Sequence, residues 1–335
     1  MSDSSSADKD VAEIIVVGAG VSGLRAAKTL VDAGLKVRVL EKSRGLGGRS
    51  ATRRHEGHRI DHGAQYFTAR DERFSAQVQR WQEAGHVRVW SEGFSTFRDG
   101  RLETSERGHP RYIFPDGMNG IGKLLGEGLD VERSSRVIGL ERDGTRDSSV
   151  WQLRLEDGLS LRAERVLLSV PAPQALELAR DALDDATQKV LSAVTFAPCL
   201  TLMAGYSAPR PSWRGVQFAD DSGPLSWLAC DSSKRLETDE TVLVMHGSPA
   251  FSEVWLETPE QGVPEMLEVA AALGFTSPTW TTMHRWRYAK VTHPHEAPFV
   301  QAEESLFLCG DWCGGDKLES AYLSGLEVAK AMLGT

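Results

Sequence analysis

The chain has 335 residues, of which 41% are hydrophobic, and a formal net charge of −9. This length suits two domains of about 100–200 residues each. The acidic balance argues against a nucleic-acid partner, because such proteins usually present a basic stripe. No apolar run approaches the roughly 20 residues that cross a bilayer, so we expect no membrane segment. The four cysteines show no C-x-x-C pair and no metal-site spacing, which favours a reduced, cytoplasmic protein without a bound metal.

Residues 1–10 are polar and rich in serine and contain no apolar core. We therefore expect a disordered tail at this position and no signal peptide. The remaining chain shows no internal repeat and no low-complexity linker, and the segments of different character alternate along it. This alternation predicts two domains that interleave in the sequence.

A dinucleotide-binding fingerprint follows the tail. The β-branched run Ile14–Val17 predicts a strand, Gly18–Gly23 reads G-A-G-V-S-G, and Leu24–Leu30 predicts a helix. A second predicted strand, Val37–Leu40, ends at the acidic residue Glu41. Strand, G-x-G-x-x-G, helix, strand and acid in this order are typical of a Rossmann unit that binds a dinucleotide. A glycine-rich turn without a ligand is the alternative, and the surrounding elements argue against it.

Each residue type in this fingerprint has a physical role. Gly18 permits the tight turn, Gly20 leaves room for a pyrophosphate, and Gly23 lets the helix pack closely on the strand. The helix N-terminus presents unpaired N–H groups and a partial positive charge to phosphates. At the tip of the second strand, the Glu41 carboxylate is placed to hold ribose hydroxyls.

A second glycine loop, Lys42–Arg49, indicates which dinucleotide binds. Three of its residues are glycines, which permit a close backbone approach, and Arg49 offers a fork of donors to phosphate. An NAD-binding unit does not need this loop. It resembles the loop of flavoproteins of the glutathione-reductase and amine-oxidase class, where the arginine meets the FAD pyrophosphate. A flexible basic loop remains the alternative interpretation.

The segment Ile60–Phe67 sharpens the resemblance. Asp61-x-Gly-Ala-Gln-Tyr-Phe after Gly-Gly-Arg resembles the renalase family more than the monoamine oxidases, and the resemblance extends over nearly the whole chain. It implies an α/β fold: a Rossmann-like FAD-binding domain with an inserted, mixed β-sheet substrate domain. It also implies that Gln65 and Tyr66 line the flavin. Metal binding by His55 and His58 is poorly supported, since no partner lies at ligand spacing.

The spacing of apolar residues predicts the helices and strands further along the chain. Apolar spacing predicts helices over Phe74–Ala84 and Gln174–Leu191 and a short helix reaching Leu125. Phe94–His109 reads as a loop or hairpin. Predicted strands in this stretch are Val87–Trp90, Asp130–Glu132, Ser135–Leu140, Trp151–Leu155, Leu159–Arg162 and Arg165–Val170. Val137 matches the family position whose backbone touches the adenine, although a core strand explains it equally well.

Three strands without long helices between them, Cys199–Tyr206, Leu225–Asp231 and Thr241–His246, predict a mixed or antiparallel sheet. We take this sheet as the substrate domain. The expected division of the chain is therefore residues 11–65, 111–190 and 296–335 for the FAD-binding domain, and residues 66–110 and 191–295 for the substrate domain.

Two stretches supply candidate catalytic residues. His246 ends a predicted strand and matches the renalase pattern, although a lone histidine is usually structural. His284–Lys290 carries four potentially positive groups and two aromatic residues. Arg285 and Trp286 either shape a substrate site beside the flavin or follow a strand with alternate side chains in solvent, and we weigh these two readings evenly.

The C-terminal segment completes the expected cofactor site. Ser305–Asp311 predicts a strand that ends in Gly-Asp, and Glu319–Ala329 predicts a helix. The resemblance implies that Asp311 accepts a hydrogen bond from a ribityl hydroxyl of FAD. It also implies that the helix N-terminus faces the N1–O2 edge of the flavin, where negative charge grows when the flavin is reduced. The context of Cys313 does not match the covalent-flavin cysteine, so we expect non-covalent FAD.

The sequence thus predicts an FAD-dependent oxidase that transfers hydride from a small-molecule substrate to flavin and then to O₂, with H₂O₂ as product. The resemblance implies that the substrate is a 2- or 6-dihydro isomer of NAD(P)H. The alternatives are an amine oxidase or desaturase of the same fold, and a non-catalytic flavin-binding redox sensor. Gln65, Tyr66, His246, Arg285 and Trp286 are the candidate catalytic residues. The candidate FAD-binding residues are Gly18, Gly20, Ser22, Gly23, Glu41, Lys42, Gly48, Arg49, Gln65, Tyr66, Val137, Asp311, Glu319 and Ser320.

Overall fold

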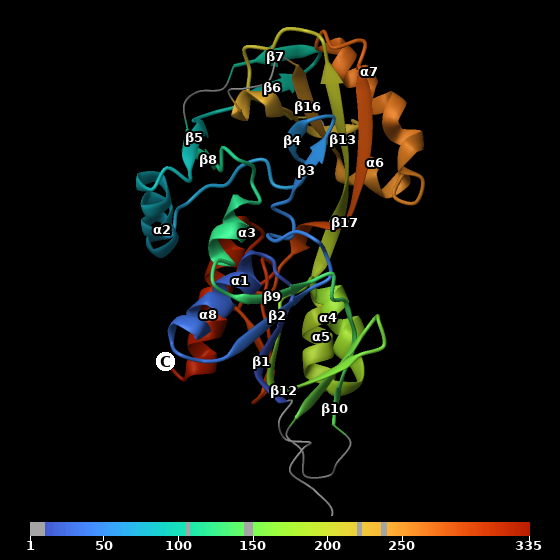
Figure 1. Ribbon diagram of the computed structural model, residues 1–335. Coiled ribbons are helices and arrows are strands. Elements are labelled where there is room, and N and C mark those ends of the chain that lie inside the picture. Colours follow the sequence, from blue (N-terminus) through green and yellow to red (C-terminus); the bar gives the residue numbers. More distant parts are fainter. Residues whose placement is uncertain (1–10, 105–107, 144–149, 220–222, 236–239) are drawn as a thin grey trace, which may run out of the picture. The chain divides into compact units, whose positions relative to one another are not determined.

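The structure is a computed structural model that describes residues 11–104, 108–143, 150–219, 223–235 and 240–335 (Figure 1). The predicted tail, residues 1–10, lies outside these ranges. The chain divides into two compact units that interleave in the sequence. Unit 1 comprises Met1–Gly48, Ile121–Thr195 and Val291–Thr335, and unit 2 comprises Arg49–Gly120 and Phe196–Lys290.

An eight-stranded sheet forms the centre of unit 1, in the order β10-β11-β12-β1-β2-β9, with β19 beside β12 and β18 beside β19. Its central strands are parallel, whereas β10, β11 and β18 pair in antiparallel fashion. The strands are β1 (Val11–Val17), β2 (Val37–Glu41), β9 (Asp130–Arg133), β10 (Val137–Arg142), β11 (Trp151–Leu155), β12 (Ser160–Leu168), β18 (Val300–Glu303) and β19 (Leu306–Leu308).

Burial explains why the first strand is apolar on both faces. Ile14, Ile15 and Val16 are fully buried, as expected for a parallel strand covered on both sides. β1 pairs with β2 on one side and with β12 on the other, and β12 in turn pairs with β19. Segments from the beginning, the middle and the end of the chain therefore meet in one sheet.

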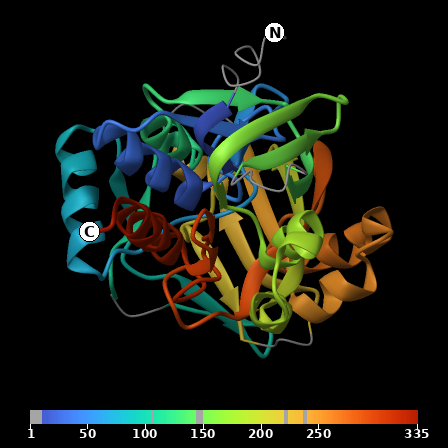
Figure 2. The same cartoon turned by 90° about the horizontal axis from the view of Figure 1, so that it is seen from below.

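The helices of unit 1 are α1 (Val21–Asp32), α3 (Gly120–Leu125), α4 (Ala172–Ala179), α5 (Asp185–Ala193) and α8 (Leu318–Leu333), with the 3₁₀ turn η2 (Arg180–Ala182). Helices α1 and α8 lie side by side in Figure 2. A Cβ atom on Gly325 of α8 would lie 2.2 Å from the backbone oxygen of Ser22 in α1, so glycine is required at this crossing. Among the described residues, no helix has the length and apolar character needed to cross a membrane.

Unit 2 contains a seven-stranded sheet in the order β17-β13-β16-β15-β14-β6-β7. A buried apolar cluster that includes Leu202, Leu228, Met245 and Phe251 packs along it. The strands are β6 (Ser95–Arg98), β7 (Arg101–Glu103), β13 (Thr195–Tyr206), β14 (Gly215–Phe218), β15 (Leu225–Cys230), β16 (Thr241–Gly247) and β17 (Trp280–His293).

The remaining elements of unit 2 are two small two-stranded sheets and several short helices. Strand β3 (Thr52–His55) pairs with β4 (His58–Asp61), and β5 (Arg88–Ser91) pairs with β8 (Arg111–Ile113). The helical elements are α2 (Glu72–Glu83), η3 (Asp231–Lys234), α6 (Pro249–Val254), η4 (Pro259–Gly262) and α7 (Val263–Ala272).

Three sequence predictions of elements need correction. The helix expected over Gln174–Leu191 is two helices, because the Asp184 side chain accepts a hydrogen bond from the backbone N–H of Thr187 and so caps a new helix. The strands expected at Leu159–Arg162 and Arg165–Val170 form the single strand β12. Helices α6 and α7 were not predicted.

The domain limits also differ from the expectation. Residues 49–65 and 111–120, expected in the FAD-binding domain, belong to unit 2, and residues 191–195 and 291–295 belong to unit 1.

Candidate functional site

The first glycine loop has the steric features that the fingerprint predicts. Gly18 has φ +105°, and a Cβ atom there would lie 2.4 Å from the backbone oxygen of Ser169. A Cβ atom on Gly23 would lie 2.2 Å from the Gly18 oxygen, so the close packing of helix on strand is confirmed. By contrast, a Cβ atom on Gly20 would meet nothing within 4 Å. The backbone at Gly20 therefore faces open space.

The second glycine loop lies against the first. The N–H of Gly47 donates to the Ala19 oxygen at 2.8 Å. Gly48 has φ +57°, and a Cβ atom on it would lie 3.3 Å from the Gly20 Cα. Helix α1 begins next to this junction, and its N-cap residue Gly20 has no side chain to satisfy the first N–H groups. The open space lies beside unpaired N–H groups of a helix N-terminus, and this arrangement suits the pyrophosphate of a dinucleotide.

Glu41 ends β2 and is buried. Its Oε2 accepts from the Ala19 N–H at 2.8 Å, and its Oε1 accepts from the Ser43 N–H at 2.7 Å. The carboxylate thus ties both glycine loops together, a role the sequence did not indicate. Because a carboxylate offers about four lone-pair sites, two remain for ribose hydroxyls.

Other predicted cofactor residues of unit 1 have partners within the unit. The Ser22 hydroxyl is hydrogen-bonded to the Ser169 hydroxyl at 2.8 Å, and the Lys42 ammonium donates to the Gln174 side chain at 3.2 Å. Val137 is buried at the start of β10. Because the Ser22 hydroxyl is paired with Ser169, the group that Ser22 would contribute to a phosphate site is its backbone N–H, at the N-terminal end of α1.

The C-terminal residues lie in the same unit. Asp311 follows β19, and the neighbouring Gly310 N–H donates to the Ser324 hydroxyl at 3.1 Å, which anchors this turn to α8. Glu319 and Ser320 lie in the first turn of α8, whose N-cap has no side-chain hydrogen bond. Unit 1 thus joins the N-terminal and C-terminal motifs through β12.

The four cysteines offer no activated thiol. Cys309 and Cys313 are buried, and burial raises the pKa of the Cys309 thiol to about 12 and that of Cys313 further. Burial also raises the pKa of Cys199 to about 11 and raises that of Cys230. Thiols held in the protonated form are poor nucleophiles, which supports the expectation of a non-covalent flavin.

Arg49 lies in unit 2, where its guanidinium Nη1 is 3.3 Å from the carbonyl oxygens of both Tyr288 and Ala289. Its guanidinium also lies 5.8 Å from the ring centroid of Phe196. The side chain is thus held against β13 and β17. A contact of Arg49 with phosphate stays a prediction.

Gln65 is buried and its amide is fully engaged. Its Nε2 donates to the backbone oxygens of Asp61 and Gly63, the latter at 3.1 Å, and lies 3.5 Å from His246 Nε2. Its Oε1 accepts from the Lys234 ammonium at 3.0 Å. The structure therefore brings two of the predicted residues, Gln65 and His246, together.

Tyr66 belongs to an aromatic cluster with Trp90, Phe94 and Trp227. Its ring centroid lies 4.9 Å from that of Phe94 and 5.7 Å from that of Trp227. Burial raises the pKa of Tyr66, although Arg111 opposes this effect. The phenol therefore stays protonated near neutral pH.

His246 is the last but one residue of β16 and is neutral near physiological pH. Burial, and then the neighbouring Lys234 charge, lower the pKa of His246 to about 4, although a hydrogen bond to the His62 backbone opposes this shift. His62 lies against Trp286, with ring centroids 5.3 Å apart, and the Trp286 indole N–H donates to the His62 oxygen at 3.0 Å. His62 thereby links His246 and Trp286.

Arg285 does not join this group. It points to the other face of β17, where its Nη1 lies 3.0 Å from the Leu256 oxygen and 2.9 Å from Glu257. Strand alternation gives the physical reason, because neighbours along a strand face opposite sides. The predicted set His246, Arg285 and Trp286 is therefore only partly assembled.

A buried ionic cluster is the feature that sequence reasoning missed. Asp61, Asp231 and Lys234 are each at most 1% exposed. The Lys234 Nζ lies 3.3 Å from Asp61 and 3.1 Å from Asp231, and Arg235 lies 3.0 Å from Asp61 and 2.5 Å from Asp231. The two cations outweigh the effect of burial and lower the pKa of Asp61. The polar run that contains Asp231 and Arg235 resembles a surface turn in sequence, so no signal revealed its burial.

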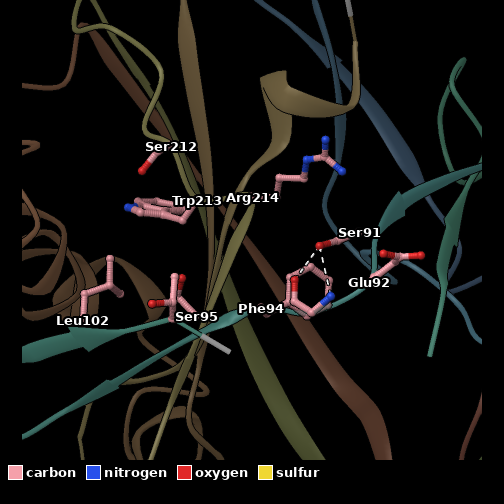
Figure 3. Close-up of a pocket in the computed structure, with 10 residues that line it drawn as sticks. Ser91, Glu92, Phe94, Ser95, Leu102, Ser212, Trp213 and Arg214 are labelled. Atoms are coloured by element: carbon pink, nitrogen blue, oxygen red, sulfur yellow. Dashed lines mark hydrogen bonds between the residues drawn. The ribbon is translucent and has the colours of Figure 1, made fainter. Parts of the chain in front are cut away.

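A pocket of about 350 Å³ also lies in unit 2 (Figure 3). The side chains of Trp213 and Arg214, which line the pocket, point in different directions, and Phe94 belongs both to the lining and to the Tyr66 aromatic cluster. Gln65, His246 and Trp286 do not line it. In the described part of the chain, no group of three or more His, Cys, Asp or Glu side chains could hold a metal ion.

Comparison with known proteins places this geometry in context. The family described as flavin containing amine oxidoreductase matches residues 69–333, and the NAD(P)-binding Rossmann-like domain matches residues 16–81. Renalase of Mus musculus is 23% identical over 348 residues, which cover 94% of this chain and 95% of the relative.

Solved structures share the fold at low identity. Putrescine oxidase bound to putrescine is 14% identical with a TM-score of 0.72, covering 97% of this chain and 99% of that chain. Cyclohexylamine oxidase from Brevibacterium oxydans IH-35A is 13% identical with a TM-score of 0.74, covering 96% and 98%.

Proposed function

We propose that this protein, which belongs to the family of flavin-containing amine oxidoreductases, oxidises 2- and 6-dihydro isomers of NAD(P)H to NAD(P)⁺ with O₂ as the electron acceptor. Membership in this family makes it an FAD-dependent oxidoreductase that acts on a small molecule. Similarity to mouse renalase along nearly the whole chain supports the narrower substrate class.

In this proposal unit 1 binds FAD. The open backbone at Gly20 and the N-terminal N–H groups of α1 hold the pyrophosphate, and Glu41 holds the ribose. Asp311 and the first turn of α8 hold the ribityl and ring end. When bound, FAD accepts a hydride from the substrate and passes the electrons to O₂, which gives H₂O₂.

Unit 2 supplies the residues that orient the substrate. Gln65 and Tyr66 are held rigidly by their neighbours, so they present a fixed surface. The Trp286 ring, fixed through its hydrogen bond to the His62 oxygen, offers a flat apolar face that suits a nicotinamide ring.

The state of His246 is the observation that carries the proposal. Among Gln65, Tyr66, His246 and Trp286, His246 is the side chain whose ordinary pKa lies near neutrality, yet it is neutral and hydrogen-bonded to the His62 backbone. Its lowered pKa makes it a weak base, and its Nε2 already faces the Gln65 amide, so it is poorly suited to take a proton from substrate. A dihydropyridine becomes aromatic by losing a hydride alone, so its oxidation needs no general base.

The aromatic cluster around Tyr66 favours a second candidate, an amine oxidase. Four rings, those of Tyr66, Trp90, Phe94 and Trp227, gather in one place, and such rings hold alkyl ammonium groups through cation–π contacts. Loss of a proton from the amine nitrogen would then be required, and His246, whose pKa is lowered, is a weak base for it.

One experiment separates these candidates. The yellow holoprotein is mixed anaerobically with borohydride-generated NAD isomers, with ordinary NADH as the matched control, and with an amine panel, while flavin absorbance is followed. We expect rapid bleaching by the isomers alone, and one H₂O₂ per substrate after O₂ is admitted. Bleaching by amines alone would support the amine oxidase, and no bleaching by any compound would support a redox sensor.

A further inference from the structure

Lys234 is a buried charge that the proposed reaction does not use. It is 0% exposed, and its ammonium lies within 3.3 Å of the Asp61 and Asp231 carboxylates and of the Gln65 Oε1. Together with Arg235, these groups form a cluster of two cations and two carboxylates that carries no net charge. An ammonium has three protons and no lone pair, so each of its neighbours must accept a hydrogen bond.

This property gives the neighbouring hydrogen bonds a direction. Because Lys234 can only donate and the backbone oxygens of Asp61 and Gly63 can only accept, the Gln65 amide turns its oxygen toward Lys234 and its NH₂ group the other way. One hydrogen of the NH₂ group is donated to the Asp61 oxygen, and the other is shared between the Gly63 oxygen and His246 Nε2, 3.5 Å away. An amide nitrogen cannot accept a hydrogen bond, so His246 Nε2 is the acceptor in this contact and carries no proton.

The protonation state of the second nitrogen of the His246 ring follows from that of the first. In a neutral imidazole, the nitrogen that does not accept carries the proton. The hydrogen bond between the His246 ring and the His62 backbone accounts for that proton. Lys234 is the charged group that faces the imidazole, and Asp61, Asp231 and Arg235 lie behind it.

We propose that Lys234 is a positioning residue that, together with the backbone oxygens of Asp61 and Gly63, fixes the orientation of the Gln65 amide and, through it, holds His246 in the neutral tautomer protonated on Nδ1. Asp61 and Asp231 anchor the lysine, and the hydrogen bonds run in one direction from Lys234 through Gln65 to His246 and the His62 carbonyl. The inference concerns the site of the proposed function, but its measurement needs no substrate, so either can fail without the other.

Nitrogen-15 NMR of the holoprotein with labelled histidine tests this proposal, with His246→Gln assigning the resonances. We expect the Nδ1-protonated tautomer of His246 from pH 6 to pH 8 in the wild-type protein. In Lys234→Met, where the backbone oxygens of Asp61 and Gly63 still contact the Gln65 amide, we expect the Nε2-protonated tautomer of His246 to appear beside the Nδ1 tautomer. Lys330→Met, which removes an ammonium paired with Glu327 in unit 1, should leave the spectrum unchanged. A wild-type His246 that is protonated on Nε2 overturns the proposal, as does a Lys234→Met spectrum in which the Nδ1 tautomer is unchanged.

Gln65→Glu keeps the test decisive if Lys234→Met does not fold. The new carboxylate still accepts from Lys234 but cannot donate to His246, so Nε2 must take up a proton to donate in its turn. We expect a donor-type Nε2 resonance at pH 6 in this variant, and a pH titration of His246 that moves upward. An unchanged neutral Nδ1 tautomer in Gln65→Glu contradicts the relay.

Discussion

Gly20 differs from the other two glycines of its motif, because a side chain at this position would not disturb the packing of the fold. Its missing Cβ leaves open space, whereas a Cβ atom on Gly18 or Gly23 would meet backbone at 2.4 Å or less. The three glycines of one motif therefore differ in what they contribute. Two of them allow the chain to pack, and the third keeps room beside the helix N-terminus.

This difference predicts how Gly20→Val behaves. We expect the variant to fold with an unfolding midpoint close to that of the wild-type apoprotein and to bind FAD at least about tenfold more weakly, a loss of about 1.4 kcal/mol. Titration of apoprotein with FAD, followed by flavin fluorescence, measures the affinity. Gly45→Val is the matched control, because a Cβ atom on Gly45 also meets nothing within 4 Å. Equal FAD affinities of both variants would remove Gly20 from the cofactor site.

At the scale of elements, strand β17 separates two neighbours that the sequence placed together. Trp286 faces His62 and His284, with ring centroids 5.3 Å and 4.4 Å away, while Arg285 pairs with Glu257 on the other face. The sequence alone favoured neither interpretation of this segment, a substrate site or a strand with alternate side chains in solvent. Alternation along the strand places the two side chains on opposite faces, and a contact of Trp286 with substrate stays a prediction.

We therefore expect Trp286→Leu to lower kcat/KM for the dihydronicotinamide isomers by at least about tenfold, because the flat ring surface is lost. Arg285→Gln should stay within about twofold of the wild-type protein. Stopped-flow reduction of the flavin at varied substrate concentration measures both variants. A large loss in Arg285→Gln with little change in Trp286→Leu would assign the substrate site to the opposite face of β17.

Local sequence signals predicted much of unit 1 and less of unit 2. The β-branched run before Gly18 and the acid at Glu41 were sufficient for β1, α1 and β2, because these elements depend on neighbours in sequence. The break at Asp184 was missed because a capping aspartate and a surface aspartate look alike in an amphipathic stretch.

The buried ionic cluster could not be predicted for a different reason. Asp61 and Lys234 are 173 residues apart, and each looks like a solvated charge in its own segment. Only the fold shows that both are fully buried. The resemblance drew attention to the segment that contains Asp61, and no local pattern indicated an ion pair with Lys234.

For the whole molecule, three histidines of unit 2 predict the pH dependence of stability. Burial, with help from nearby charges, lowers the pKa of His62 to about 3 and those of His246 and His284 to about 4. An unfolded histidine titrates near about 6.5. Between these values the unfolded chain binds more protons than the folded one, so acid favours unfolding in this window. Asp231 opposes this trend because burial raises its pKa.

We expect the free energy of unfolding to fall as the pH drops from about 6.5 to about 4, by up to about 2 kcal/mol at pH 5 for each of His62 and His246 and by less for the more exposed His284, whose charge solvent screens. Urea unfolding of the holoprotein at pH 7.5 and pH 5.0 measures the change. His246→Gln should show a smaller difference between the two pH values than the wild-type protein. A wild-type midpoint that is the same at both pH values would show that these histidines titrate normally in the folded state.

The place of β1 in its sheet has a consequence for synthesis. Val11 pairs with Arg162, and the strand gains β2 as its other neighbour from residues close behind it. At about 5–20 residues per second, a ribosome needs roughly 10–30 s to deliver the distant partner. During that interval one edge of a largely apolar strand stays unpaired, which is the kind of surface on which nascent chains aggregate. Translation speed and holdase chaperones are therefore expected to govern the soluble yield of this polypeptide.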